Sequence, residues 1–217
     1  FKYGNGDIYR GHFEHGCKHG KGVFIWKNGD TYVGQFCNDR LEGYGKMTYA
    51  AGHSYIGNWV YGKKEGQGKF NYADKNVYDG SWHEDQRHGQ GKFIWNDAKA
   101  KQIEFYDGQW AHDCREGLGF YQYQNGSTYE GNWISGVREG HGVFQYADGT
   151  FYKGKFRRDK RSGYGIFQAV EGITYCGDWK NGNMHGFGAL INASGNKYEG
   201  EFFEGRKHGD GAVFFED

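Results

Sequence analysis

The hydrophobic and polar residues of the chain recur with a fixed period. The motif Tyr-x-Gly-x-(Trp/Phe), followed by Gly-x-Gly-x-(apolar), occurs nine times, and its Tyr residues stand at positions 9, 32, 55, 78, 106, 129, 152, 175 and 198. Every step is 23 residues except one of 28, between Tyr78 and Tyr106. A period of this size predicts an array of small stacked units rather than a globule, because each unit contacts only its neighbours.

Within each repeat, the spacing of apolar residues and glycines predicts two β-strands. Counted from the Tyr as repeat position 0, positions 2, 11 and 13 are Gly and position 4 is Trp or Phe in all nine repeats. Position 15 is always apolar, and position 17 is aromatic in seven repeats. These even separations match the two-residue period of strands, so each repeat is expected to form a β-hairpin. Position 7 is always Gly or Asp and is expected in the turn.

The same alternation predicts a sheet with one buried face and one solvent-exposed face. The aromatic and glycine positions share one face, and the opposite face is mostly polar in the first half of the chain. If position 4 lies across from position 11, each ring covers the bare backbone of a glycine. At about 4.8 Å per strand, the fold class is an all-β, elongated single-layer array on the order of 85 Å long.

The first eight residues repeat the second half of the motif. Tyr3 to Tyr9 matches Trp26 to Tyr32, so we expect residues 1–8 to complete a preceding repeat and the chain to be a fragment of a longer array. Residues 9–217 are then nine repeats of one continuous rod.

Composition and charge exclude several classes of function. Lys+Arg and Asp+Glu both total 27, whereas proteins that bind nucleic acid through phosphates normally carry a positive excess. No apolar run approaches 18 residues and no signal peptide is recognisable, which favours a cytoplasmic protein. The four cysteines form no CxxC pair, which indicates reduced thiols rather than a disulfide framework.

The combined pattern resembles the MORN (membrane occupation and recognition nexus) repeat, as in Tyr129-Glu-Gly131-Asn-Trp133, followed by Gly140-His-Gly142. The resemblance covers essentially the whole chain. It implies a scaffold without enzymatic activity at cytoskeletal or membrane-proximal assemblies, as in the all-repeat proteins of protozoan parasites. Other family members append kinase, methyltransferase or exchange-factor domains, and no such pattern is visible in this sequence. The family name implies membrane binding but supplies no lipid-binding residue.

One departure from the repeat is the five-residue insertion within Lys99 to Phe105. It is expected to lengthen one connection between hairpins. The alternative is a hinge or a docking bulge.

Repeats 7 to 9 (residues 152–217) carry apolar residues where earlier repeats are polar. An apolar end of an array invites association, so we predict a two-fold homodimer through these repeats. The alternative is apolar surface that the protein simply tolerates. The candidate dimer residues are Ile166, Cys176, Phe187, Ala189, Ile191, Phe202, Phe203, Ala212, Val213, Phe214 and Phe215.

Basic residues recur at position 9 in seven repeats (Lys18, Lys64, Arg87, Arg115, Arg138, Arg161 and Lys207). They predict either a basic ridge for an anionic partner or ion pairs with acids at position 10. A denser patch in repeat 7 is a candidate site for phosphoinositides, other anionic lipids or an acidic partner. It consists of Lys153, Lys155, Arg157, Arg158, Lys160 and Arg161.

Catalytic chemistry is not expected. Four of the ten histidines occupy repeat position 10, and no Ser-His-Asp order, phosphate loop or HExxH motif occurs. Cys17 and Cys37, with His15 and His19, are weak candidates for zinc, and Cys176 for a metal or disulfide across a dimer axis. No cofactor is predicted.

The sequence therefore predicts a scaffold that homodimerises through its C-terminal repeats and binds cytoskeletal proteins, with nucleic acid excluded. The alternative is an adaptor that binds anionic phospholipids through the repeat 7 patch and works at the periphery of membranes.

Overall fold

The computed structural model describes residues 1–97, 100 and 102–216. It divides into two compact units, residues 1–98 with 109–114 and residues 99–108 with 115–217. The described residues form 18 strands and no helix, so the predicted all-β class is confirmed. The strands are Ile8–Glu14 (β1), Cys17–Ile25 (β2), Thr31–Cys37 (β3), Arg40–Thr48 (β4), Ser54–Val60 (β5), Lys63–Asn71 (β6), Val77–His83 (β7), Gln86–Trp95 (β8), Glu104–Ala111 (β9), Cys114–Gln122 (β10), Thr128–Ile134 (β11), Val137–Gln145 (β12), Phe151–Arg157 (β13), Lys160–Gln168 (β14), Thr174–Lys180 (β15), Asn183–Ile191 (β16), Lys197–Phe203 (β17) and Arg206–Phe214 (β18).

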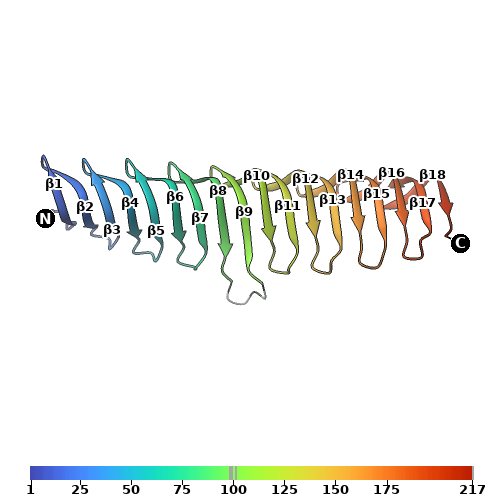
Figure 1. Ribbon diagram of the computed structural model, residues 1–217, viewed down its shortest axis with the longest axis horizontal. Coiled ribbons are helices and arrows are strands. Elements are labelled where there is room, and N and C mark those ends of the chain that lie inside the picture. The colour runs from blue at the N-terminus through green and yellow to red at the C-terminus, as the bar shows by residue number, and fades with distance from the viewer. Residues whose placement is uncertain (98–99, 101, 217) are drawn as a thin grey trace. The chain divides into compact units, whose positions relative to one another are not determined.

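Each repeat is one β-hairpin, as its period predicts. Consecutive strands pair antiparallel from β1 to β8 in the first unit and from β10 to β18 in the second (Figure 1). Two residues, at positions 6 and 7, join the strands of every hairpin, and all of them have positive φ. Tyr61 and Gly62, for example, have φ of 49° and 82°. Two successive positive φ values define the tight turn that suits twisted strands, which explains Gly or Asp at position 7.

The register within a hairpin differs from the one expected from sequence. In repeat 3, Gly57 (position 2) pairs with Gly68 (position 13), and Trp59 (position 4) pairs with Lys64 (position 9). Position 11 lies across from position 4 of the next repeat instead, as Gly66 pairs with Trp82. Positions 11 and 12 thus form a bulge, and Gly is needed at position 11 because its φ is positive in every repeat, for example 66° at Gly66.

The core of each unit is the face that carries the position-0 tyrosines, here named the tyrosine face. Tyr32, Tyr55 and Tyr78 are all fully buried, and the hydroxyl of Tyr78 donates a hydrogen bond to the Ser81 carbonyl oxygen over 2.8 Å. Burial raises the pKa of Tyr32 to about 12. Each ring crosses the glycines at positions 2 and 13 of its own hairpin, where an added Cβ would collide with it. The ring that covers the glycines is therefore the tyrosine, not the Trp or Phe at position 4.

The position-4 rings join neighbouring repeats. Tyr55 makes edge-to-face contacts with Trp59 of its own repeat at 5.1 Å and with Trp82 of the next repeat at 5.5 Å between ring centroids. The Trp82 indole N–H also donates to the carbonyl oxygen of Gly68 over 3.0 Å. Aromatic packing and hydrogen bonding thus hold each hairpin to the one before it.

The insertion lengthens one connection, as predicted. The segment between β8 and β9 spans residues 96–103, whereas the segment between β2 and β3 spans residues 26–30. Lys99 and Lys101 of the predicted insertion lie outside the described residues. A continuous rod over residues 9–217 stays a prediction.

Candidate functional site

The basic residues at position 9 lie on the tyrosine face and pack on aromatic rings. The Arg161 guanidinium carbon is 4.1 Å from the ring centroid of Trp179, and Lys64 Nζ is 4.6 Å from that of Trp82. Burial lowers the pKa of Lys64. Because these side chains are partly buried, their cation–π contacts stabilise the packing of the repeats.

The same residues are hydrogen-bonded to the turn of the next repeat. Where position 7 is Asp, the basic residue forms an ion pair with it, in Lys18–Asp39 (2.8 Å), Lys64–Asp85 (3.7 Å), Arg87–Asp113 (2.9 Å) and Arg138–Asp159 (2.9 Å). Where position 7 is Gly, Arg115 and Arg161 donate to its carbonyl oxygen. Hydrogen bonding to Lys18 lowers the pKa of Asp39 to about 2. The predicted ion pairs exist, but with position 7 of the next repeat rather than with position 10.

Glutamates at position 10 have a different role at the turns. In repeats 2, 3, 5 and 6 their carboxylates accept a hydrogen bond from the backbone N–H at position 6 of the following repeat. The four bonds are Tyr61 to Glu42 (3.0 Å), Glu84 to Glu65 (2.9 Å), Ser135 to Glu116 (2.9 Å) and Arg158 to Glu139 (2.8 Å). Each carboxylate therefore satisfies a turn amide that the backbone leaves unpaired.

The structure divides the predicted basic patch of repeat 7 between several locations. Lys153 and Lys155 lie along β13 on the face opposite the tyrosines, here named the open face, and Arg161 packs on the tyrosine face. The others line a pocket of about 420 Å³ at the hairpin turns, here named the turn pocket, in the second unit. Its lining residues are Arg157, Arg158, Lys160, Arg161, Ser162, Lys180 and Asn181.

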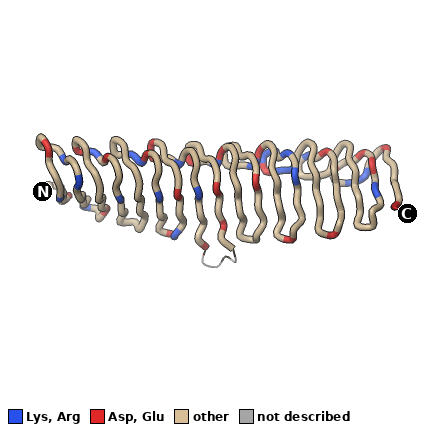
Figure 2. Tube along the Cα trace, viewed as in Figure 1, with Lys and Arg blue, Asp and Glu red and all other residues tan. Residues whose placement is uncertain are grey.

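Sequence reasoning missed three residues of the turn pocket, Ser162, Lys180 and Asn181. Lys180 and Asn181 belong to repeat 8 and reach the pocket because position 10 of one repeat lies beside position 5 of the next. Grouping residues by that adjacency, rather than by distance along the chain, is the signal that would have found them. Figure 2 shows basic and acidic positions mixed along the turns of both units.

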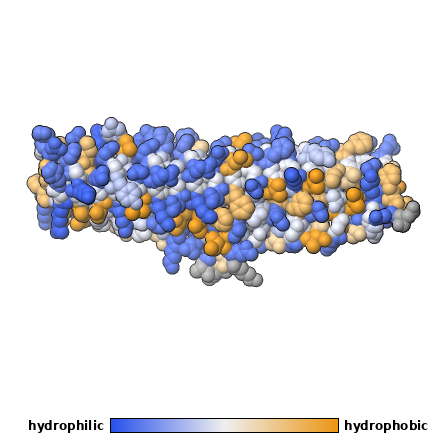
Figure 3. All heavy atoms as spheres, in the orientation of Figure 1, coloured by the Kyte–Doolittle hydropathy of each residue, from blue (hydrophilic) through white to orange (hydrophobic). Residues whose placement is uncertain are grey.

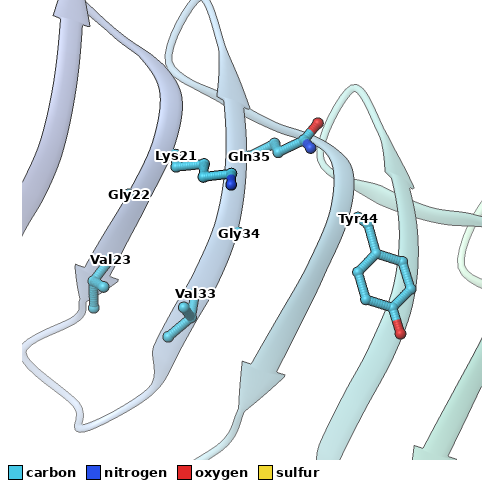
Figure 4. A pocket seen from close by; sticks show the side chains of 7 residues that line it. All are labelled: Lys21, Gly22, Val23, Val33, Gly34, Gln35 and Tyr44. Atoms are coloured by element: carbon cyan, nitrogen blue, oxygen red, sulfur yellow. The ribbon is translucent and has the colours of Figure 1, made fainter.

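Two shallower pockets lie over glycines of the open face. One, in the first unit, has a volume of about 450 Å³. In Figure 4, Val23 and Val33 lie side by side on β2 and β3, with Tyr44 on the neighbouring β4. The second unit has a counterpart of about 550 Å³ at equivalent positions of repeats 8 and 9, lined by Phe187, Ala189, Glu199, Asp210 and Ala212 over glycines. In the view of Figure 3, hydrophilic residues separate the apolar ones into patches.

The candidate dimer residues fall on both faces of the sheet. Ile166 lies across from Cys176, and Cys176 across from Ala189, which brings these three together on the open face. Ile191, Phe187, Phe203, Ala212 and Phe214 share that face by alternation. Val213, Phe215 and Phe202 lie on the tyrosine face. Phe202 is only 3% exposed, packed between Tyr175 and Tyr198, so it belongs to the core and not to a surface.

The weak metal candidates are free thiols at separate places. Cys17 begins β2, Cys37 ends β3 and Cys176 lies within β15. A hydrogen bond with the Asp39 carboxylate raises the pKa of Cys17. In the described part of the chain, no three His, Cys, Asp or Glu side chains are grouped to hold a metal ion. Nor does it contain a helix long and apolar enough to cross a membrane.

Stacked hairpins with an aromatic face and a two-residue turn define a class of β-repeat arrays. The model of the MORN repeat matches residues 9–31, 32–54, 55–77, 78–98, 106–128, 129–151, 152–174, 175–197 and 198–211. The chain therefore belongs to the MORN-repeat family. The unmatched residues 99–105 coincide with the insertion.

Among the solved structures that match are two domains of low similarity. The TCP10 domain of Danio rerio CPAP matches with 11% identity and a TM-score of 0.47, over 93% of this chain and 92% of that chain. The TCP domain of Drosophila melanogaster SAS-4 (dCPAP), in complex with a proline-rich motif of Ana2 (dSTIL), matches with 13% identity and a TM-score of 0.43, over 71% of this chain and 81% of that chain. Likeness at this level establishes no shared function. Comparison with curated protein sequences gave no match.

Proposed function

We propose that the protein is a non-enzymatic scaffold that homodimerises through the open face of repeats 7 to 9 and binds cytoskeletal or membrane-proximal proteins. The polar residues that recur along the array are hydrogen-bonded between repeats, which supports a structural role for them. The cytoskeletal or membrane-proximal setting is what membership of the MORN family implies.

One observation carries the dimer proposal: the open face of repeats 7 to 9 is both apolar and self-complementary in charge. Phe187 and Tyr164 are 65% and 63% exposed there, beside Ile166, Cys176 and Ala189. Exposed apolar side chains gathered on a charged surface are typical of protein interfaces.

The order of charges favours a two-fold axis over repeat 8. Lys153 and Lys155 stand at positions 1 and 3 of repeat 7, and Glu199 and Glu201 stand at the same positions of repeat 9. If the axis runs parallel to the strands of repeat 8, the second copy faces the first with its repeats in reverse order. Repeat 7 of one copy then lies over repeat 9 of the other. Each lysine of one copy then opposes a glutamate of the other, and Phe187 of one copy opposes Tyr164 of the other, while Cys176 and the exposed Asp178 of β15 lie at the axis itself. Glu199 also pairs with Lys197 at 2.7 Å within the chain.

The Phe187→Asp variant tests this interface. The substitution adds a second carboxylate beside Asp178 in the interface, and burying this like-charged pair is unfavourable, so the variant is expected to sediment as a monomer where the wild type is a dimer. Tyr44→Asp is the matched control, because Tyr44 has the same position 12 in repeat 2 and a similar exposure of 57%. The control is expected to remain dimeric. A Phe187→Asp protein that still sediments as a dimer contradicts the proposal.

A second candidate function is an adaptor for anionic phospholipids. The observation in its favour is the turn pocket, in which Arg157, Arg158, Lys160 and Lys180 gather and which no acidic side chain lines. Several adjacent basic residues favour anionic membrane surfaces by about 1 kcal/mol each. Binding to anionic vesicles that weakens with salt, retained in the monomeric Phe187→Asp variant, is the expected result for this candidate. Absence of such binding at low salt rules it out.

A further inference from the structure

The turn pocket occupies a position where other repeats hold a carboxylate. In repeats 2, 3, 5 and 6 a Glu at position 10 accepts the position-6 N–H of the next repeat, at 2.8 to 3.0 Å. In repeat 7 this residue is Ser162, whose side chain is shorter and uncharged. The corresponding amide of Asn181 has no hydrogen-bond partner among residues 1–97, 100 and 102–216. The site thus retains a donor and lacks its anionic acceptor.

The surroundings of this amide are cationic. Arg157, Arg158, Lys160 and Lys180 line the same pocket, and within the described residues none of their side chains forms an ion pair. Two acids of the adjacent turns are already engaged, since Asp159 pairs with Arg138 and Glu139 accepts the N–H of Arg158. In the repeats that carry Glu at position 10, the carboxylate itself supplies the negative charge.

The ligand that fits is an oxyanion with more than one charge. Arg guanidinium groups present paired donors that match phosphate oxygens, and Lys ammonium groups add point charges. A free backbone N–H in a turn is a further donor to phosphate. A pocket of about 420 Å³ has room for a phosphate group together with part of the molecule that carries it.

We propose that the turn pocket binds the phosphate group of a phosphomonoester, with one oxygen accepting the Asn181 N–H in the place that a Glu carboxylate takes in other repeats. The phosphomonoester is either a soluble molecule or a lipid headgroup. The proposal rests on the same pocket as the phospholipid-adaptor function above. All residues of the site belong to the protein, so phosphate binding does not require a membrane.

Titration of the isotope-labelled protein with inorganic phosphate, followed by amide NMR, tests the site directly. Saturable shifts are expected at Asn181 and at the side-chain N–H groups of Arg157 and Arg158. Shifts that are not saturable, or that spread evenly over the basic residues of all repeats, overturn the proposal.

The decisive variant is Ser162→Glu, which restores the residue that four other repeats carry and therefore keeps the fold. Its carboxylate is expected to cap Asn181 and weaken phosphate binding by about tenfold or more, as the loss of one charge-assisted hydrogen bond implies. Glu116→Ser is the matched control, because it frees the Ser135 amide in a turn without the cationic cluster, and it is expected to gain no phosphate site. Unchanged phosphate binding in Ser162→Glu refutes the assignment.

Vesicles of phosphatidylcholine, with and without phosphatidylinositol phosphate, separate the two sources of the ligand. Co-sedimentation that depends on the phosphorylated lipid and is lost in Ser162→Glu supports a headgroup ligand. Inorganic phosphate binding without co-sedimentation supports a soluble phosphomonoester, and then the site stands while the phospholipid adaptor function fails.

Discussion

At the scale of single residues, tyrosine and glycine at fixed positions set the geometry of each hairpin. The tyrosine ring lies flat across positions 2 and 13, which leaves no space for a Cβ there. The glycine at position 11 has a different reason to be invariant, because there the backbone has positive φ and space remains beside it, as at Gly66. Glycine therefore meets two separate structural requirements within each 23-residue repeat: absence of a Cβ under the tyrosine ring and a positive φ in the bulge.

Substitution of a position-13 glycine tests the first demand. In Gly142→Ala the new methyl group would lie 2.5 to 2.6 Å from the hydroxyl oxygen and two ring carbons of Tyr129, so the side chain or the strand must shift. We expect a loss of about 1–3 kcal/mol in unfolding free energy, the usual range for overpacking, measured by urea denaturation. Gly4→Ala is the control, since nothing lies within 4 Å of its added Cβ. Equal midpoints for the two variants contradict this account of the tyrosine face.

The buried tyrosines also predict alkaline unfolding. The pKa of Tyr32, Tyr152 and Tyr175 is raised by burial from 10.0 to about 12. Above pH 10 the unfolded chain loses these protons while the folded chain keeps them. Their contribution to stability is therefore complete below pH 10 and is lost as pH rises towards 12, by about 1.4 kcal/mol per pH unit for each tyrosine. Urea unfolding at several pH values measures the slope, and a flat profile in this window is the contrary result.

At the scale of elements, the hairpin could be predicted from the sequence and its register could not. Alternation and turn residues predicted two strands, the turn at position 7 and the buried face, because these depend on neighbours within a few residues. The bulge at positions 11 and 12 shifts the pairing beyond it, so position 9 faces position 4. That shift in register determines which side chains are in contact, and the alternation of apolar and polar residues does not predict it. For this reason the sequence pattern predicts ion pairs with position 10, whereas the structure forms them with Asp at position 7.

The coupling between hairpins predicts a graded response at position 4. In Trp133→Phe edge-to-face contact with Tyr106 and Tyr129 is retained, whereas the indole hydrogen bond to the Gly119 oxygen is lost and the cation–π contact with Arg115 is reduced. A cost of about 1 kcal/mol is expected, and Phe156 shows that the position accepts phenylalanine. Trp133→Ala removes the ring and is expected to cost about 3–5 kcal/mol in unfolding free energy. Similar losses for both variants, measured by urea denaturation, are incompatible with ring packing as the main link.

At the scale of the whole molecule, function is expected where the repeats differ. The net charge is zero, from 27 basic and 27 acidic residues, but the charges are unevenly distributed. Repeat 7 is basic and the open face of repeat 9 is acidic. The sequence located the apolar and basic departures of repeats 7 to 9. It could not show that the sheet divides them between two faces, or that Phe202 is buried while Lys180 joins the turn pocket. Those assignments depend on adjacency between repeats.

The dimer proposal makes a prediction that depends only on charge order. Lys155→Glu leaves each copy with acids at both matched positions, Glu201 included, and Glu201→Lys leaves each copy with lysines at both. Like charges then oppose each other across the axis, so each variant alone is expected to be a monomer. An equimolar mixture restores two opposite pairs per dimer.

Sedimentation velocity of the two variants, alone and mixed, is the most direct test of the central claim. The proposed interface predicts monomers for Lys155→Glu and for Glu201→Lys and a heterodimer in their mixture, with a sedimentation coefficient equal to that of the wild-type dimer. Dimers of either variant alone, or a mixture that remains monomeric, would contradict a two-fold interface across the open face of repeats 7 to 9.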